Sequence, residues 1–377
     1  MKEVVCLSTS NFHPFPTRKQ NVMTRLQAER VLYFDPPVTW LAPLKDKNAR
    51  SRLCAYRRQP EQATDKVTVC ATPPVLPFFN KFRFINRINQ RRLARYVKRR
   101  MKELGFNQPL LWCYSPTSCD IVSHLPHRGL VYDCVDRHSA YPGLIDPKVV
   151  DGMERDLARQ CDTVFCTAQG LYDTLREYND KTCLIPNGAA YELFSQAAGE
   201  SRSERPVFGF VGMLQECIAY DYLLALADAM PEADIVLIGR TLPGVDISQL
   251  RQRPNIKLPG LMPQPELPAV MRDFSVCLNL FAPGRLSRDV SPLKFYEYLA
   301  TGKPLVTTRE PRQVEDYSGL VYIADDIPSF LDCCRRALAE NDPELRRRRM
   351  EAGQAASWDN RVKQMEDLLQ ENLVGGR

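Results

Sequence analysis

Short hydrophobic runs alternate along the chain with longer segments in which apolar residues recur at helical spacing. Each run is about four to eight residues long, the usual length of a strand that is buried on both faces. Strands that alternate with helices are typical of β/α units that build a parallel sheet, so we predict an α/β fold. The predicted strands of the first half are residues 3–8, 30–35, 66–71, 110–115, 129–135, 162–167 and 182–186, and those of the second half are residues 207–212, 233–239, 255–260, 275–281, 303–308 and 319–324.

A polar stretch without hydrophobic periodicity, at about residues 195–206, separates the two series of strands. Such a composition indicates a linker. We predict two Rossmann-like β/α/β domains that face a central cleft, the first over residues 1–200 and the second over residues 206–354. The last segment, about residues 355–377, is amphipathic, and we expect this helix to pack back onto the first domain.

The composition, with 44% hydrophobic and 25% charged residues, is that of a folded globular protein. No stretch approaches the roughly 18 consecutive apolar residues of a membrane span, and the first residues lack a signal-peptide pattern, so we expect a cytoplasmic protein. The 13 cysteines form no C-x-x-C pair and are expected to be free thiols. Because no metal-binding motif and no G-x-G-x-x-G motif is present, we expect no metal and no resident cofactor.

Every charged residue between positions 81 and 102 is basic, and hydrophobic residues are interleaved with the lysines and arginines. The pattern predicts a basic amphipathic helix with three interpretations: a solvated surface helix, an interfacial helix on anionic lipid, or a helix that follows nucleic-acid phosphates. No nucleic-acid motif accompanies the segment, so we expect no nucleic-acid partner. Our hypothesis is docking on an anionic membrane surface.

Residues 289–304, with the sequence DVSPLKFYEYLATGKP, have the most informative pattern. A helix with Ser291 as its N-cap and a proline in its first turn would place Lys294 and Glu297 on one face. A carboxylate there can accept hydrogen bonds from two ribose hydroxyls, while an ammonium near a helix N-terminus favours a diphosphate. An ordinary surface ion pair is the alternative. The position after a strand, at the ligand-binding edge of a Rossmann-like sheet, favours the binding site.

The second half resembles the donor-binding domain of bacterial GT-B glycosyltransferases, especially those of capsule, teichuronic acid and exopolysaccharide synthesis. The motifs FGFVGML, ADIVLIGR, NIKLPGLMPQPELPAVM and SPLKFYEYLATGKPLVTT occur in the family's order over most of residues 206–310, and the first half matches more loosely. The resemblance implies transfer of a sugar from a nucleotide diphosphate sugar to a glycan or lipid-linked acceptor in cell-surface polysaccharide synthesis. It also implies no obligatory metal. Together with the basic segment at residues 81–102, it leads us to expect a peripheral location on the inner face of the cell membrane.

The resemblance further implies that Glu297 holds the donor ribose and that Lys294 contacts the diphosphate. Gly212 matches a glycine that lets the backbone approach the phosphates, which the absence of a Cβ would allow. Many retaining members carry two glutamates eight residues apart, whereas this chain has Asp289 at the first position. They also carry an arginine and a lysine in the loop after the first strand of the donor domain, where this chain reads QECIAYD. The stereochemical outcome therefore stays open, and the positive charge for the diphosphate is expected from Lys294, with Arg240, Arg285 or Arg288 as further candidates.

An inverting transferase needs a general base in the acceptor domain. Asp136 is our preferred candidate because it follows a predicted strand, with Asp133 and His138 close in sequence; a turn residue is the alternative. His138 could instead contact the donor sugar. We also predict contact with the acceptor or the membrane for several basic residues: His13, Arg18, Lys19, Arg91, Arg92, Arg95 and Arg99. Two competing functions remain: a sugar-nucleotide epimerase of the same fold, and a non-catalytic GT-B scaffold.

Overall fold

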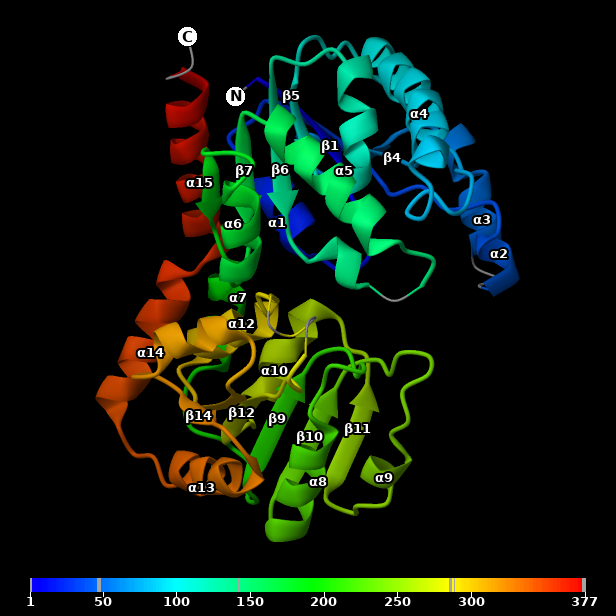
Figure 1. Ribbon diagram of the computed structural model, residues 1–377. Helices are drawn as coiled ribbons and strands as arrows, with labels where there is room; N and C mark the ends of the chain where they lie inside the picture. Colours follow the sequence, from blue (N-terminus) through cyan, green and yellow to red (C-terminus); the bar gives the residue numbers. More distant parts are fainter. Residues whose placement is uncertain (1, 46–48, 142, 285–286, 288, 375–377) are drawn as a thin grey trace. The chain divides into compact units, whose positions relative to one another are not determined.

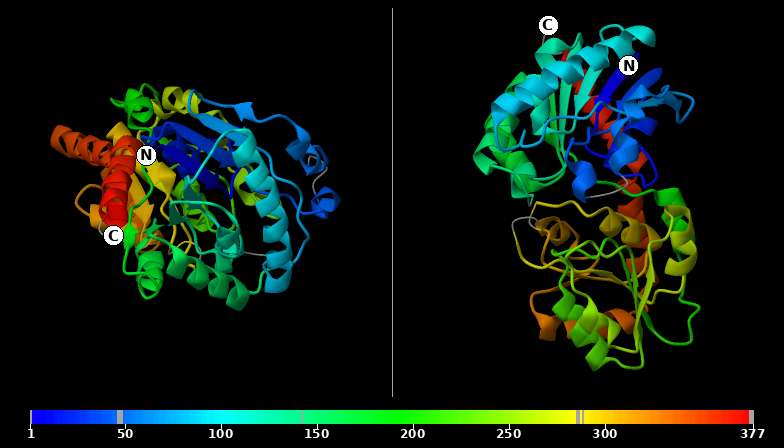
Figure 2. Two further views of the ribbon diagram at one scale, coloured as in Figure 1. Left: turned by 90° about the horizontal axis from the view of Figure 1, so that it is seen from above. Right: turned by 90° about the vertical axis from the view of Figure 1, so that its right-hand side faces the viewer.

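The structure, a computed structural model, describes all residues except 1, 46–48, 142, 285–286, 288 and 375–377 (Figures 1 and 2). The chain divides into two compact units: unit 1 comprises Met1–Pro186 and Val362–Arg377, and unit 2 comprises Asn187–Arg361. Residues 187–200, which the sequence pattern placed with the first domain, belong to unit 2. The reason is that Ala189, Phe194 and Ala197 pack in the core of that unit.

Unit 1 is built around a sheet with the strand order β3-β4-β2-β1-β5-β6-β7-β8. Neighbouring strands are parallel except for the edge pair β3 and β4. The strands are β1 (Glu3–Leu7), β2 (Arg30–Phe34), β3 (Glu61–Gln62), β4 (Val67–Cys70), β5 (Leu110–Cys113), β6 (Gly129–Cys134), β7 (Thr163–Cys166) and β8 (Thr182–Leu184). The helices are α1 (Arg18–Arg25), α2 (Ala42–Lys45), α3 (Ala49–Leu53), α4 (Arg83–Glu103), α5 (Pro147–Gln160), α6 (Gln169–Arg176) and, from residue 362 onward, α15 (Trp358–Val374).

Helices cover both faces of the unit 1 sheet because its strands are hydrophobic on both sides. Successive residues of a strand point to opposite faces. In β1, Val5 joins the core that contains residues of α4, α5 and α6, whereas its neighbours Val4 and Cys6 are buried on the opposite face. With both faces covered, the loops after the strands at the carboxyl edge are the part of the unit open to ligands.

Unit 2 contains a parallel sheet with the order β11-β10-β9-β12-β13-β14. Its strands are β9 (Val207–Val211), β10 (Asp234–Ile238), β11 (Ile256–Gly260), β12 (Val276–Asn279), β13 (Leu305–Thr308) and β14 (Tyr322–Ala324). Its helices are α7 (Tyr191–Phe194), α8 (Tyr220–Ala229), α9 (Ser248–Arg251), α10 (Leu267–Met271), α12 (Leu293–Thr301), α13 (Ile327–Leu338) and α14 (Pro343–Ala355). One apolar core joins the sheet to α8 and α13, and another joins it to α7, α10 and α12.

The predicted α/β class with two Rossmann-like domains is confirmed. Every predicted strand contains an observed one, whereas β3 was not predicted because its two exposed residues, Glu61 and Gln62, form no hydrophobic run. The cysteines are free, as expected. Within the described ranges, no helix is both long enough and apolar enough to cross a lipid bilayer.

Candidate functional site

α12 carries the informative segment of the sequence and begins later than predicted. Its first residue is Leu293 and its N-cap is Pro292, which makes no side-chain capping bond, so the prediction that Ser291 caps the helix is wrong. Ser291 is buried, and its Oγ accepts a hydrogen bond from the Asn187 N–H at 3.0 Å. The Asn187 side-chain amide donates to the Ser291 carbonyl oxygen at 2.6 Å. Ser291 therefore ties the first residue of unit 2 to the loop before α12.

Two glycines and a tyrosine hold α12 in place within unit 2. The helix ends at Gly302, whose φ of 69° is a left-handed conformation that favours glycine. Gly353 of α14 packs so closely that a Cβ there would lie 2.5 Å from the Ala300 nitrogen. The Tyr298 hydroxyl accepts a hydrogen bond from the Val211 N–H at 2.6 Å. This bond fixes α12 against the carboxyl end of β9.

Glu297 and Lys294 form the ion pair that their helical spacing allows. Lys294 Nζ lies 2.5 Å from Glu297 Oε2, and Glu297 Oε1 accepts a hydrogen bond from Gln264 Nε2 at 3.3 Å. Glu297 is only 2% exposed, and this burial raises the pKa of its carboxyl group, while the Lys294 charge opposes the shift. A ribose that binds Glu297 must therefore displace one of these two donors or share a carboxylate oxygen with it. Gln264, in the loop after β11, was not singled out from the sequence.

Gly212 follows β9, and the backbone around it is tightly packed against the loop after β10. Its N–H donates to the Ile238 carbonyl oxygen at 2.9 Å. A Cβ on Gly239 would lie 1.8 Å from the Gly212 carbonyl oxygen, so only glycine fits at position 239. The sequence reasoning missed Gly239, although a glycine that ends a hydrophobic strand was a visible signal. The two glycines let two strand-end loops share one edge of the sheet.

Arg240 comes next along the chain and is exposed at this same edge. With Gly239, Gly260 and Leu261 it lines a cavity of about 220 Å³ at the ends of β10 and β11. Within the described part of unit 2, its guanidinium group takes part in no hydrogen bond and no ion pair. Asp289 is buried. The candidates Arg285 and Arg288 lie outside the described residues.

In unit 1, Arg18 and Asp133 form a buried ion pair. Arg18 Nε lies 2.9 Å and 3.0 Å from the two carboxylate oxygens of Asp133, and Arg18 Nη1 donates to the Pro186 carbonyl oxygen at 3.1 Å. The side chains are 1% and 0% exposed. We predicted acceptor or membrane contact for Arg18 and a catalytic role for Asp133, but the two charged groups are buried against each other. We therefore correct their role to that of positioning residues, which link α1, β6 and the chain after β8.

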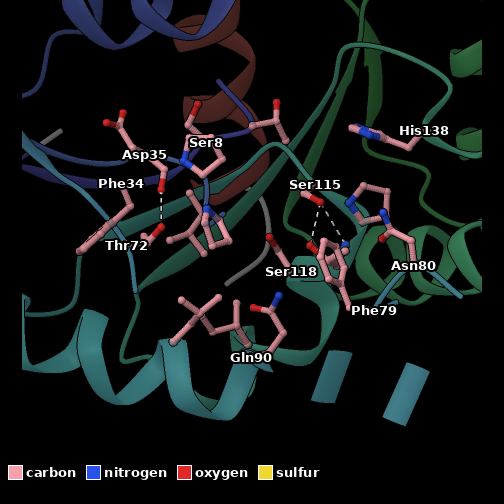
Figure 3. Close-up of a pocket in the computed structure, with 18 of the residues that line it drawn as sticks. Ser8, Phe34, Asp35, Thr72, Phe79, Asn80, Gln90, Ser115, Ser118 and His138 are labelled. Carbon is pink, nitrogen blue, oxygen red and sulfur yellow. Dashed lines mark hydrogen bonds between the residues drawn. The ribbon is translucent and has the colours of Figure 1, made fainter. Parts of the chain in front are cut away.

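A cavity of about 460 Å³ lies at the carboxyl edge of the unit 1 sheet (Figure 3). Lys19, Asp136 and His138 line it, so the structure brings these three predicted residues together. Asp136 Oδ2 accepts a hydrogen bond from the Tyr141 hydroxyl at 2.7 Å. Burial lowers the pKa of Lys19, and the charge of Asp136 opposes that shift.

His138 is neutral at pH 7, because burial lowers its pKa to about 4. Its ring is hydrogen-bonded to the backbone of Tyr114. The buried Nε2 has no hydrogen-bond partner among the described residues. A neutral ring with one unpaired nitrogen on a cavity wall is suited to contact with an uncharged polar group such as a sugar hydroxyl.

Both polar and apolar side chains line the rest of the cavity. Figure 3 shows Gln90 reaching from α4 towards the cavity, with Asp35 and Thr72 on one side and Ser115 on another. The apolar lining residues come from strand ends, from α4 and α5 and from the loops between them: Leu7, Phe34, Phe79, Leu93, Val97, Ile121, Ile145 and Val150.

The arginines predicted for membrane or acceptor contact lie away from this lining. Arg91, Arg92, Arg95 and Arg99 are exposed on α4 and do not line the cavity, and Arg99 pairs with Glu103 at 3.6 Å. His13 is also outside the lining and lies 3.3 Å from Glu61. Across the described residues, no group of three or more His, Cys, Asp or Glu side chains could hold a metal ion.

Comparisons with known proteins agree with this architecture. Residues 205–340 match the family described as "Glycosyl transferases group 1". TuaH of Bacillus subtilis (strain 168), whose name is that of a teichuronic acid biosynthesis glycosyltransferase, is 27% identical over 237 residues. That match covers 57% of this chain and 60% of TuaH, so the chain matches less than two thirds of the length of that relative.

Solved structures resemble the whole chain. Sucrose-phosphate synthase from Thermosynechococcus elongatus superimposes with a TM-score of 0.72 at 15% identity, with 100% of each chain covered. Anabaena HepE, solved in complex with UDP, gives a TM-score of 0.68 at 15% identity and covers 98% of this chain and 100% of its own. The chain thus has the fold of the GT-B glycosyltransferases, as the sequence predicted. The match to the group 1 glycosyltransferases lies within its second unit.

Proposed function

We propose that the chain is a glycosyltransferase that moves a sugar from a nucleotide diphosphate sugar, bound by unit 2, to a hydroxyl acceptor, bound by unit 1. The observation that carries the proposal is the placement of Gly212, Arg240, Lys294 and Glu297 at the carboxyl edge of the unit 2 sheet, inside the segment that matches the glycosyltransferase family. The UDP bound to HepE makes UDP the first nucleotide to test.

In the proposed donor complex, the ribose hydroxyls bind Glu297 and take the place of Lys294. The freed ammonium of Lys294 is then available to the diphosphate, whose charge it neutralises. Arg240 adds a second cation at the same edge. Positive side chains would thus stabilise the departing nucleoside diphosphate without a metal ion.

We assign acceptor binding to the unit 1 cavity and the role of general base to Asp136. The carboxylate would remove the proton of the attacking hydroxyl while the new glycosidic bond forms and the bond to the diphosphate breaks. Tyr141 holds one oxygen of Asp136, which leaves the other for the acceptor. His138 would contact a sugar hydroxyl through its unpaired Nε2.

We also propose a glycan or lipid-linked acceptor in cell-surface polysaccharide synthesis, at the inner face of the cell membrane. The name of the relative TuaH supports the first part. The basic exposed surface of α4 supports the second.

A thermal-shift screen with nucleotides and nucleotide sugars tests donor binding, because a ligand that binds the folded chain raises its Tm. Turnover is then measured with and without an added glycan acceptor. Release of the sugar in the absence of acceptor, at the full rate, would indicate an epimerase instead. Asp136→Asn should abolish transfer while it leaves the thermal shift with the donor unchanged. An unchanged transfer rate in Asp136→Asn would refute its role as the base.

A further inference from the structure

α4 changes character along its length. In its C-terminal half the apolar residues Leu93, Tyr96, Val97 and Met101 are buried in the core of unit 1, as in an ordinary surface helix. At its N-terminal end the pattern is inverted. Phe82, just before the helix, and Phe84 and Ile88 within it are 44%, 62% and 44% exposed.

Polar side chains take the inward positions at this end of α4. Asn89 forms two hydrogen bonds with the backbone of Leu76, at 2.9 Å and 3.0 Å. The Asn86 amide donates to the Thr117 carbonyl oxygen at 2.9 Å and to Asp120 at 2.8 Å. These hydrogen bonds satisfy the polar groups on the inward face of the helix. Packing in the core of unit 1 therefore does not explain why large apolar residues lie on the outward face.

The outward face forms one continuous stripe. Residues at alternating spacings of four and three lie on one side of a helix. From Phe84 this spacing runs through Ile88 and then reaches only cations, all of them exposed: Arg91, Arg95, Lys98 and Lys102. The stripe therefore begins with two apolar side chains and continues with positive charge.

Exposed apolar residues of two loops lie near the same end of the helix. Phe78 and Leu144 are 38% and 53% exposed. The Asp146 N–H donates to the Asn80 carbonyl oxygen at 3.0 Å, which joins the loop of Leu144 to the loop before α4. Asn80 also lines the unit 1 cavity. We call Phe78, Phe82, Phe84, Ile88 and Leu144 the apolar rim.

We infer that the apolar rim inserts into the surface of an anionic lipid bilayer, with the cations of the α4 stripe on the lipid headgroups. The aliphatic residues Ile88 and Leu144 favour a bilayer over nucleic acid, because beside a row of cations that follows a nucleic-acid backbone they would meet charged phosphates, whereas a bilayer buries them. A second copy of the chain would bring two rows of cations towards each other, whereas an anionic surface complements them. The inference deepens the proposed membrane location and places the cavity, through Asn80, beside the lipid.

Vesicle co-sedimentation of the full chain, without any nucleotide, tests this surface. The vesicles contain phosphatidylcholine alone or with about one third phosphatidylglycerol. We expect binding to the anionic vesicles only, and weaker binding at high salt. Phe84→Ser/Ile88→Ser should weaken the partition coefficient about tenfold or more, and Arg91→Gln/Arg95→Gln should weaken it about tenfold or more.

Matched controls come from exposed positions in unit 2. Met213→Ser/Leu261→Ser removes two exposed apolar side chains, and Arg347→Gln/Arg348→Gln removes two exposed cations; neither should change vesicle binding. All variants should keep the native Tm. Equal loss in the controls, or undiminished binding in both α4 variants, would overturn the inference. So would a dimer in lipid-free solution that Phe84→Ser/Ile88→Ser converts to a monomer. Donor titrations with the two α4 variants, whose changes lie in unit 1, separate this result from the proposed transferase activity.

Discussion

Replacement of Arg18 by methionine should destabilise unit 1 strongly. Arg18 Nε contacts both carboxylate oxygens of Asp133, at 2.9 Å and 3.0 Å, and Asp133 is 0% exposed. Arg18→Met would leave this carboxylate buried without its cation. Loss of one partner of a buried ion pair costs about 3–5 kcal/mol. For a domain of about 200 residues this corresponds to a fall in Tm of about 10 °C.

Differential scanning calorimetry of a double-mutant cycle measures this loss. Arg18→Met and Asp133→Leu are compared with the double variant, in which apolar groups replace both charges. Because an apolar replacement of a buried ion pair is often close to neutral, the double variant should recover most of the lost stability. The cycle thus separates the cost of an unpaired charge from the cost of altered packing.

A loss below about 1 kcal/mol in Arg18→Met, the range of exposed ion pairs, would refute the reasoning. The assignment of Asp133 as a positioning residue has its own test. If Asp133→Asn kept the native Tm and still lost all transferase activity, Asp133 would have to act in the chemistry itself.

Three further predictions concern single residues. Gly239→Ala should lower the free energy of unfolding by about 1–3 kcal/mol, because the new Cβ would lie 1.8 Å from the Gly212 carbonyl oxygen. The same variant should bind nucleotide more weakly in a calorimetric titration. Gly152→Ala in α5 should instead raise Tm, since only Arg155 lies near the added Cβ and alanine favours a helix by about 0.5–1 kcal/mol; a lower Tm would contradict this. Between pH 6.5 and about 4, the unfolded chain should bind a proton at His138 that the folded chain does not bind, so the free energy of unfolding should fall as the pH falls through this range. His138→Asn should reduce this fall. An NMR titration that gives His138 a pKa near 6.5 would show the burial argument to be wrong.

The sheets could be predicted from the sequence because parallel strands that are buried on both faces appear as hydrophobic runs. Arg18 and Asp133 show where such reasoning ends. They are separated by 115 positions, and no local pattern indicates that each neutralises the other. A charged residue beside a strand end therefore resembles a catalytic residue in the sequence even when it is buried in an ion pair.

α4 shows a related limit. Its sequence predicts a basic amphipathic helix, but not which apolar residues face the core. Asn86 and Asn89 turn inward because the backbones of Thr117 and Leu76 supply hydrogen-bond partners. These partners are 31 and 13 positions away in the sequence and come close only in the fold. Ser291 was assigned wrongly for a similar reason, since its partner is the distant Asn187 and not the first turn of α12.

Calorimetric titration of UDP into the full chain tests the central claim most directly, namely that Lys294 and Glu297 bind a nucleotide diphosphate. Charge-assisted hydrogen bonds contribute about 1.5–3 kcal/mol each, so Lys294→Ala and Glu297→Ala should each weaken Kd about tenfold or more. The matched control is the exposed ion pair of Glu344 and Arg347 on α14, which has the same spacing of three residues. Its alanine variants should bind like the native chain. Binding of UDP, GDP or ADP that is equally strong in the native chain and in both α12 variants would contradict the account.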